Sequence, residues 1–553
     1  MFIIPIDKAI LYYLILICLL KVIISEDIEI NYVVNNDNIY DLNSFYIITK
    51  IIFTINQENP NYYLFGIFEG SNDTSFSDSL PLTMIKENDI KNVGSNNISI
   101  NIPNSYRYIR YIPYNNDGTI IAPIKIYGHK FDENEDLSEK ENYHPTNLPL
   151  MIINTENSVE PDSKEVYINS QIIIINSKGK LKLNQTAGVR LRGHATSKGE
   201  KKPYKIKFDD KSEIPGIDGK YKSWALLANY YDKALIRNHL AFEVSRRIGL
   251  KYTPRCVFLD VIFNRNFRGN YYICDQVEVK KDRVDITEMD ENDNSYPNIT
   301  GGYFLEFDQR VIADEGLLFL TDRGLIGEIK YPDEDDITKE QINYIRQYMN
   351  IFEKSTYIGN FKYLDLDSFY KYFIMQEFCG DIDTVISSFH VYKERNDDKL
   401  YFGPVWDYDL AFDNDGRLFP TKEKDMFCYN YGASAGSLRH FITKIIGTKN
   451  IMNSIYTTWI ALQEDNLNFA NLKNFIDNET EKLMESANLN NLRWYGSEIG
   501  NGTNDYKNSV QVIIDYIEAR FDSLTFLIKK YDSAPELKKI NIGILFIFLI
   551  LLV

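Results

Sequence analysis

The spacing of hydrophobic residues divides the chain into an N-terminal part built of strands and a C-terminal part that also contains helices. Between residues 26 and 130, apolar and polar residues alternate in short runs separated by Asn, Gly, Asp and Pro, which is typical of β-strands. No helical period competes there, so we expect an all-β sandwich over residues 26–130. Residues 131–149 are acidic and poor in apolar side chains, which predicts a linker.

From residue 150 onward the pattern mixes both periods. Strand-like runs such as QIIIIN and VFLDVIF dominate the first half of this region, and helical stretches dominate the second half. In the stretch ALIRNHLAFEVSRRIG, apolar residues recur at every fourth position and form one face of a helix. We therefore expect a separate α+β domain over residues 150–530, with its strands and helices segregated into two lobes.

Both ends of the chain are strongly apolar, and each has the arrangement of an addressing signal. Residues 1–25 combine Lys8 with an apolar run, as in a secretory signal peptide, and a retained signal anchor is the alternative. Residues 531–553 contain Ser533, the expected attachment residue, then a polar spacer and a terminal run of twelve apolar residues. This order is typical of a GPI-attachment signal, with a tail anchor as the alternative. We expect a protein at the cell surface, held to the membrane by a lipid anchor.

Composition narrows the class of protein further. The net charge of −17 argues against a nucleic-acid partner, because phosphate backbones are bound by clustered Lys and Arg. Six Asn-x-Ser/Thr sequences are compatible with a secreted glycoprotein. Removal of a signal peptide would leave Cys256, Cys274, Cys379 and Cys428, which allow three pairings in an oxidising compartment. Cys256 and Cys274 flank a hairpin-like stretch, which favours a cross-strand bridge without excluding the other pairings.

Residues 188–210 concentrate positive charge on two predicted strands that are joined by a Gly-containing turn. Because side chains alternate along a strand, the cations of each strand share one face. A turn with free backbone amides and ammonium groups behind it can hold phosphate, whereas a solvated basic hairpin is the alternative interpretation. The cations are Arg190 and Arg192 on the first strand and Lys205 and Lys207 on the second.

Residues 378–415 concentrate negative charge around a second predicted hairpin. Asp381 and Asp383 follow the end of a predicted helix, and Asp407 and Asp409 follow the strand-like run LYFGPVW. Strand pairing can bring such distant carboxylates together, where they can hold Mg2+ and orient a hydroxyl group for phosphoryl transfer. A system of Asp-capped turns is the alternative.

Together these segments resemble the CotH (spore coat protein H-type) kinase family over roughly residues 150–530. RLRGHATS is similar to the family's LRGNSS-type loop, and KKPYKIKF to its K-K-x-Y-K-I-K-F strand. WALLANYYDKALIRNHLAFE is similar to its W-x-L-x-A-N-x-x-D-x-x-x-x-R-N helix entry. RGNYYICDQVEVKKDRVDI, GGYFLEFD, IKYPDEDDIT and GPVWDYDLAF follow in the family's order. Separately, residues 105–128 resemble the last strands of galactose-binding-like jelly rolls. Such modules often bind glycans, but many are only spacers, so the resemblance leaves both roles open.

The family resemblance implies an atypical, two-lobed protein-kinase-like fold that transfers phosphate from ATP to Ser or Thr with Mg2+ or Mn2+. Asp383 would orient the acceptor hydroxyl, and Asp407 would hold the metal ion, with Asp409 as its neighbour or alternate. The nucleotide-binding residues implied are Arg190 and Arg192 around the loop, Lys205 or Lys207 on the phosphates, and Glu243 as the ion-pair partner of that lysine.

Two departures from the family pattern leave two functions open. Ser388 stands where the family has an Asn expected to bind a second metal ion, and His194 replaces the Asn of the RGNSS-type loop. One function is a kinase that phosphorylates secreted, coat or cell-wall proteins. The other is a cell-surface adhesin or wall-interaction protein whose kinase-like domain has little or no activity.

Overall fold

The computed structural model describes residues 27–532, apart from a set of internal segments. The expected signal peptide, the expected lipid-attachment signal, Cys428 and Asp383 lie outside the described residues. No helix within the described part is both long enough and apolar enough to span a bilayer. The internal segments left out are 36–37, 56–59, 91–93, 115–120, 122–123, 309–316, 382–385, 415–435 and 499.

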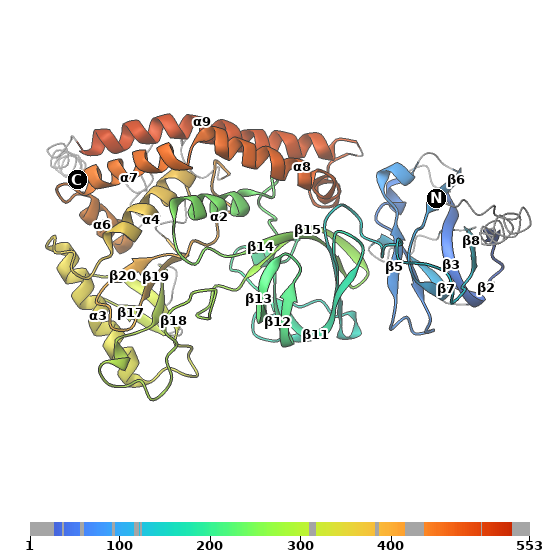
Figure 1. Cartoon of the computed structure of the whole chain (residues 1–553), viewed down its shortest axis with the longest axis horizontal. Coiled ribbons are helices and arrows are strands. Elements are labelled where there is room, and N and C mark those ends of the chain that lie inside the picture. Colours follow the sequence, from blue (N-terminus) through green and yellow to red (C-terminus); the bar gives the residue numbers. More distant parts are fainter. Residues whose placement is uncertain are drawn as a thin grey trace, which may run out of the picture. The chain divides into compact units, whose positions relative to one another are not determined.

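The fold is mixed α and β, with strands in the N-terminal part and long helices in the C-terminal part, as the hydrophobic pattern predicts (Figure 1). Contacts divide the chain into two units. Unit 1 contains residues 1–189, 258–270 and 498–500, and unit 2 contains residues 190–257, 271–497 and 501–553.

Unit 1 begins with a sheet of eight antiparallel strands, drawn in blue in Figure 1. The order along the sheet is β1-β8-β3-β7-β4-β5, and β2 and β6 also pair with β3. The strands are β1 (Ile28–Glu29), β2 (Val33–Val34), β3 (Ile39–Ile55), β4 (Ile67–Ser71), β5 (Leu80–Met84), β6 (Gly94–Ser99), β7 (Ser105–Ile112) and β8 (Ile124–Lys130). Residues 131–149, the expected linker, contain no helix or strand.

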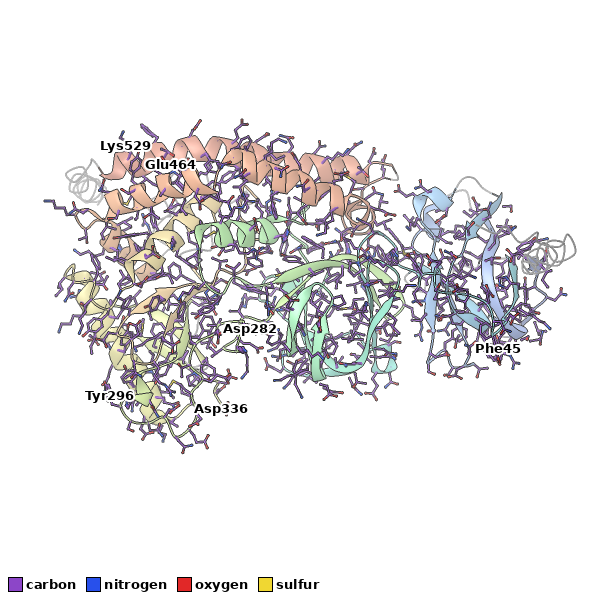
Figure 2. All side chains as sticks on the ribbon, in the orientation of Figure 1. Phe45, Asp282, Tyr296, Asp336, Glu464 and Lys529 are labelled. Carbon is purple, nitrogen blue, oxygen red and sulfur yellow. The ribbon has the colours of Figure 1, made fainter. Side chains whose placement is uncertain are left out.

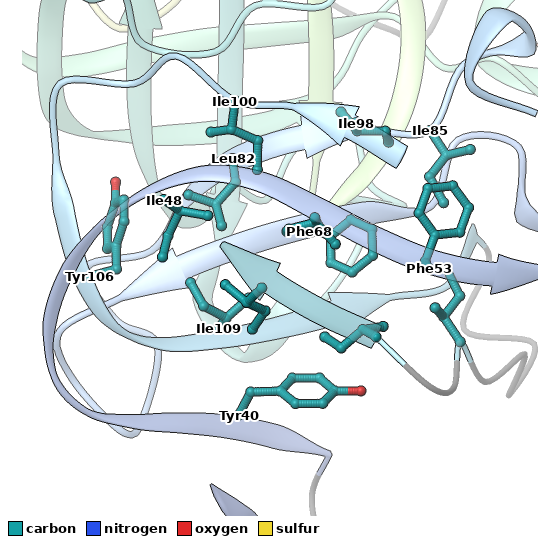
Figure 3. Packing of buried hydrophobic residues seen from close by; sticks show 14 of the residues in the cluster. Tyr40, Ile48, Phe53, Phe68, Leu82, Ile85, Ile98, Ile100, Tyr106 and Ile109 are labelled. Atoms are coloured by element: carbon teal, nitrogen blue, oxygen red, sulfur yellow. The ribbon is translucent and has the colours of Figure 1, made fainter. Parts of the chain in front are cut away.

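The long strand β3 links this sheet together, because it pairs with β2, β6, β7 and β8. Its apolar side chains, among them Ile48 and Phe53, pack with Phe68 and Ile109 in a buried cluster between the strands (Figure 3). Apolar and polar positions alternate along these strands because every second side chain faces this core.

Seven further strands form a closed barrel in the order β10-β11-β12-β13-β15-β14-β9, and β11, β14 and β15 each run through both units. Apart from the parallel pair of β9 and β14, the pairings described are antiparallel. The strands are β9 (Leu150–Thr155), β10 (Ile168–Ile175), β11 (Leu181–Leu191), β12 (Tyr204–Ile214), β13 (Ile217–Leu227), β14 (Cys256–Phe263) and β15 (Asn266–Asp275).

Unit 2 adds a five-stranded sheet and the helices. The order of this sheet is β17-β18-β16-β19-β20. Its strands are β16 (Tyr303–Phe307), β17 (Leu318–Leu320), β18 (Ile326–Tyr331), β19 (Phe389–Lys393) and β20 (Leu400–Phe402). The helices are α2 (Arg237–Ile248), α3 (Lys339–Tyr357), α4 (Leu366–Cys379), α6 (Gly436–Ile446), α7 (Ile451–Asp465), α8 (Phe469–Trp494) and α9 (Gly502–Asp532).

The C-terminal helices pack side by side, with α9 along both α8 and α7, and α7 in turn contacts α4 (Figure 1). Charged residues such as Glu464 and Lys529 cover their outer surface (Figure 2). Inside, the fully buried Arg520 of α9 donates to the backbone oxygen of Glu377 in α4 and pairs with its carboxylate at 3.3 Å. A buried charge is tolerated there because it is paired and hydrogen-bonded.

Candidate functional site

Four cations from the end of β11 and the start of β12 form one cluster in unit 2. Lys205 and Lys207 pair with Ala225 and Ser223 of β13, and Arg190 and Arg192 come from the last residues of β11 and just beyond it. We call Arg190, Arg192, Lys205 and Lys207 the basic cluster. The structure therefore brings together all four residues that the sequence singled out as a phosphate cradle.

The cations of the basic cluster act on one another electrostatically, as the pKa of Lys205 indicates. Removal from water lowers the pKa of Lys205 from its usual value, and the positive charge of Arg190 lowers it further. Arg192 and Lys207 act in the same direction, whereas the carboxylate of Glu278 opposes them. Cations that repel one another in this way are stabilised by an added anion, so the cluster has the charge that a polyphosphate requires.

The turn after β11 has the backbone geometry of a close-approach loop. Gly193 adopts a φ of 79°, and a Cβ atom at this position would lie 2.2 Å from the hydroxyl oxygen of Thr196. Lys202 donates to the carbonyl oxygen of Ser197 at 2.9 Å. The side chain of His194 is exposed, and its carbonyl oxygen accepts a hydrogen bond from the Ser197 hydroxyl at 3.0 Å. The turn is thus held by its own polar groups.

A second contact fixes the residues that lead into β12. The fully buried Lys201 donates to the side-chain oxygen of Asn490 in α8 at 2.8 Å, and its ammonium group lies 4.6 Å from the centre of the Tyr271 ring. This lysine is therefore a structural tie rather than a member of the basic cluster.

Arg192 connects the basic cluster to the WDYD segment, residues 406–409. Its guanidinium carbon lies 5.1 Å from the centre of the Trp406 ring. Burial lowers the pKa of Arg192 from its usual value, and the negative charge of Asp407 opposes that shift. Asp407 is exposed and adopts a φ of 67°, while Asp409 is buried. The structure thus places Asp407, a predicted metal ligand, in the field of the basic cluster.

Helix α2 holds the WDYD segment in place. Asn238 accepts a hydrogen bond from the backbone N–H of Tyr408 at 2.8 Å, and Arg237 donates to the carbonyl oxygen of Ala411 at 3.0 Å. Arg237 also pairs with Asp232 at 2.5 Å, and both side chains are buried. From composition alone, the stretch that contains α2 cannot be distinguished from an ordinary amphipathic helix. The Arg-Asn pair of the family-like motif was the available signal for its positioning role.

Glu243 does not have the partner that the family resemblance implies. It forms ion pairs within its own helix, with Arg247 at 2.8 Å and Arg246 at 3.4 Å, and no ion pair among the described residues joins it to Lys205. The i,i+3 and i,i+4 spacing makes these local partners the nearer ones. The carboxylate that acts on Lys205 is Glu278, which residue spacing did not single out.

On the acidic side, the structure describes Asp381 but not Asp383. Helix α4 ends at Cys379 and is capped by Gly380, which adopts a left-handed conformation, and the buried Asp381 follows. The backbone N–H of Phe412 donates to the carbonyl oxygen of Cys379 at 2.8 Å, which ties the residues just after the WDYD segment to the end of α4. Among the described residues, no three His, Cys, Asp or Glu side chains form a metal-binding group.

Ser388, the residue at the expected Asn position, is held by its backbone. It adopts a φ of 57°, and its N–H donates to the Glu306 carboxylate at 3.0 Å. Glu306 also lies 3.6 Å from the ammonium group of Lys330 and 3.9 Å from the His390 ring. Sequence reasoning did not find this carboxylate, because its partners come from three different strands or loops.

The cross-strand disulfide favoured by the sequence is not formed. Cys256 and Cys274 are free thiols on neighbouring strands, and Cys379 is also free. Burial raises the pKa of Cys274 well above its usual value, and the neighbouring Cys256 adds to the shift. Disulfide exchange requires a thiolate, which this environment disfavours.

Comparison with known proteins identifies the family. The family model described as CotH kinase protein matches residues 189–524. The chain belongs to the CotH kinase family. This membership indicates a kinase-like function. The matched range contains the basic cluster, helix α2 with Arg237 and Asn238, and the WDYD segment.

The other comparisons add little to the family assignment. No curated protein matches the chain. Among solved structures, CBM62 from Clostridium thermocellum Xyl5A is 26% identical, with a TM-score of 0.16. That match covers 16% of this chain and 66% of the other, just under two thirds of its length.

Proposed function

We propose that this member of the CotH family transfers the γ-phosphoryl group of ATP to Ser or Thr residues of secreted, coat or cell-wall proteins, through an atypical kinase-like fold. The observation that carries the proposal is the convergence of four cations on one site beside Asp407. Phosphoryl transfer depends mainly on positioning and charge neutralisation, so a cation cluster next to carboxylates has the required chemistry.

Each residue has a role in this proposal. The basic cluster binds the nucleotide phosphates, with the Gly193 turn covering them. Asp383 accepts the proton of the acceptor hydroxyl and orients it for attack. Asp407, with Asp409 as neighbour, would hold Mg2+ or Mn2+, which neutralises the charge of the phosphates when bound. The exposure of Asp407 and its place in the field of Arg192 fit this role.

A transfer assay tests the proposal. The full chain is incubated with labelled ATP, Mg2+ or Mn2+, and an extract of wall proteins. Labelling is expected to fall to background for Asp383→Ala and Asp407→Ala. Asp522→Ala is the matched control, because Asp522 is an exposed aspartate of the same unit, on helix α9 and outside the family motifs. Absent labelling, or labelling that survives both substitutions, contradicts the proposal.

The second candidate function is a surface adhesin with a weakly active or inactive kinase-like domain. The observation that favours it is Ser388, because a hydroxyl is a poorer metal ligand than an amide oxygen, and its backbone is held by Glu306. Thermal stabilisation by ATP without phosphate transfer would support this candidate over the first.

Location and glycan binding complete the proposal. We propose that residues 1–25 direct the chain into the secretory pathway and that residues 531–553 are replaced by a GPI anchor at Ser533. Release of the protein from intact cells by a phosphatidylinositol-specific phospholipase C tests the anchor. The N-terminal module is proposed to bind glycans, and its strand β7 contributes Arg110 and Ile112 to a polar cavity of unit 1, which supports this part.

A further inference from the structure

Unit 1 contains a cavity of about 250 Å3 that shares no residue with the basic cluster. It lies between strand β7, the segment after β9 and the β14–β15 hairpin. Its lining is polar apart from one isoleucine. The lining residues are Arg110, Ile112, Ser158, Glu160, Asn264, Arg265 and Asn266.

Two arginines of this cavity converge on one carboxylate. Arg110 and Glu69 are directly opposite each other on β7 and β4, and they form an ion pair. Arg265 approaches the same carboxylate oxygen of Glu69 at 3.4 Å, and Glu69 is only 4% exposed. Burial lowers the pKa of Arg110 from its usual value. The negative charge of Glu69 opposes that shift, and the positive charge of Arg265 adds to it. The single negative charge of Glu69 thus neutralises only one of the two arginines, and one positive charge is left over.

The hairpin that carries Arg265 is fixed in place. Asn264 accepts from the backbone N–H of Thr155 at 2.9 Å and donates to its hydroxyl at 2.8 Å. Phe267 stacks on Phe65 with ring centres 5.4 Å apart. Arg265 is therefore presented by a preorganised turn, which lowers the entropy cost of binding a ligand.

The remaining charge in the cavity limits what the ligand can be. Glu160 lines the wall and pairs with Arg268, so its carboxylate can accept a hydrogen bond from a hydroxyl group but repels a second negative charge. A dianion is disfavoured by Glu160 and Glu69, and a neutral ligand leaves the surplus cation unmatched. The volume is just below the range of about 300–1,000 Å3 that is usual for ligand sites, so it suits no more than one ring.

We infer that this cavity binds a uronic-acid unit of an acidic glycan, with its carboxylate on Arg265 and Arg110 and a ring hydroxyl on Glu160. The inference rests on the glycan-binding part of the proposed function and names the site and ligand class. The kinase-like part of the proposal is independent of it.

Calorimetric titration of the full chain with glucuronate, glucose and acetate tests the inference. Glucuronate is expected to bind at least tenfold more tightly than glucose, which lacks the carboxylate, and than acetate, which lacks the hydroxyls. Equal affinity for acetate would identify a simple anion site, and equal affinity for glucose a neutral sugar site. Either result overturns the inference.

Two variants and a control locate the binding. Arg265→Asn suits the positive φ of this position and is expected to weaken glucuronate binding at least tenfold. Glu160→Gln, at a half-exposed position, is expected to reduce the preference for glucuronate over acetate. Arg107→Gln, on the same strand as Arg110 but outside the cavity, should leave binding within twofold. Unchanged binding by both cavity variants overturns the inference.

A glycan array separates this inference from the broader proposal. If the array shows glycan binding that Arg265→Asn retains, the module binds glycans elsewhere and only the inference fails. If the full chain binds no glycan, both fail.

Discussion

Arg237 provides the most direct test of how the WDYD segment is positioned. It is 2% exposed, pairs with Asp232 and donates to the carbonyl oxygens of Ala411 and Phe412 at 3.0 and 3.4 Å. Arg237→Met keeps most of the apolar body of the side chain and removes its charge and its donors. The substitution leaves the 1% exposed Asp232 without its cation.

Removing one partner of a buried ion pair costs about 3–5 kcal/mol, because the other charge stays buried. Asp232 keeps two backbone donors, the N–H groups of Ala234 and of residue 237, which favours the lower half of that range. Since a domain is stable by about 5–15 kcal/mol, the variant is expected to fold but with a large loss. The control Arg246→Met breaks a solvent-exposed ion pair with Glu243 on the same helix and should cost about 1 kcal/mol or less.

Urea denaturation measures both variants. A lower midpoint at an unchanged slope reports a loss of stability. The double variant Asp232→Asn with Arg237→Met should recover part of the loss, because it removes the unpaired charge. A loss below about 1 kcal/mol for Arg237→Met alone would refute the reasoning that this pair is a buried tie.

Three further predictions follow from charges and thiols of unit 2. Lys205→Met is expected to weaken ATP binding by roughly 10- to 100-fold, which corresponds to the loss of one charge-assisted hydrogen bond. Lys211 of the same strand is exposed, and Lys211→Met should leave ATP binding unchanged. The thermal stabilisation that ATP produces measures both variants. Because burial raises its pKa, Cys274 should resist iodoacetamide at pH 8 in the folded chain and react after denaturation, and rapid native labelling would contradict this. Burial lowers the pKa of His390 below its usual 6.5, with Glu306 opposing and Lys330 adding to the shift, so the unfolded chain binds the extra proton. Stability should therefore fall as pH drops below about 6.5, and His390→Gln should flatten that part of the pH profile of urea midpoints.

Local patterns in the sequence predicted the elements well. The helix expected over ALIRNHLAFEVSRRIG, residues 234–249, is present as α2 within three residues of its expected limits, and the helices expected in the later part of the domain are present among α3 to α9. Their apolar spacing is a local property that packing reinforces, so it can be interpreted without the rest of the fold. The expected domain limits stay predictions.

Partners in space were harder to predict than elements. Glu243 was expected to pair with a lysine, but arginines three and four residues away are nearer. Glu278 reaches Lys205 from the residues after β15, and Glu306 reaches Ser388 from β16. Such contacts depend on how strands are ordered in a barrel or sheet, which no short-range pattern encodes.

The sequence by itself determined the mixed fold class, the positions of the basic and acidic segments, and the family, because these depend on local periodicity and on ordered motifs. Only the tertiary structure decided that Arg192 meets Trp406 and Asp407, that Arg237 and Asn238 hold the WDYD segment, and that Arg110 and Arg265 share Glu69. Each of these depends on segments far apart in the chain. Burial and charge balance select such partners only when the whole chain has folded.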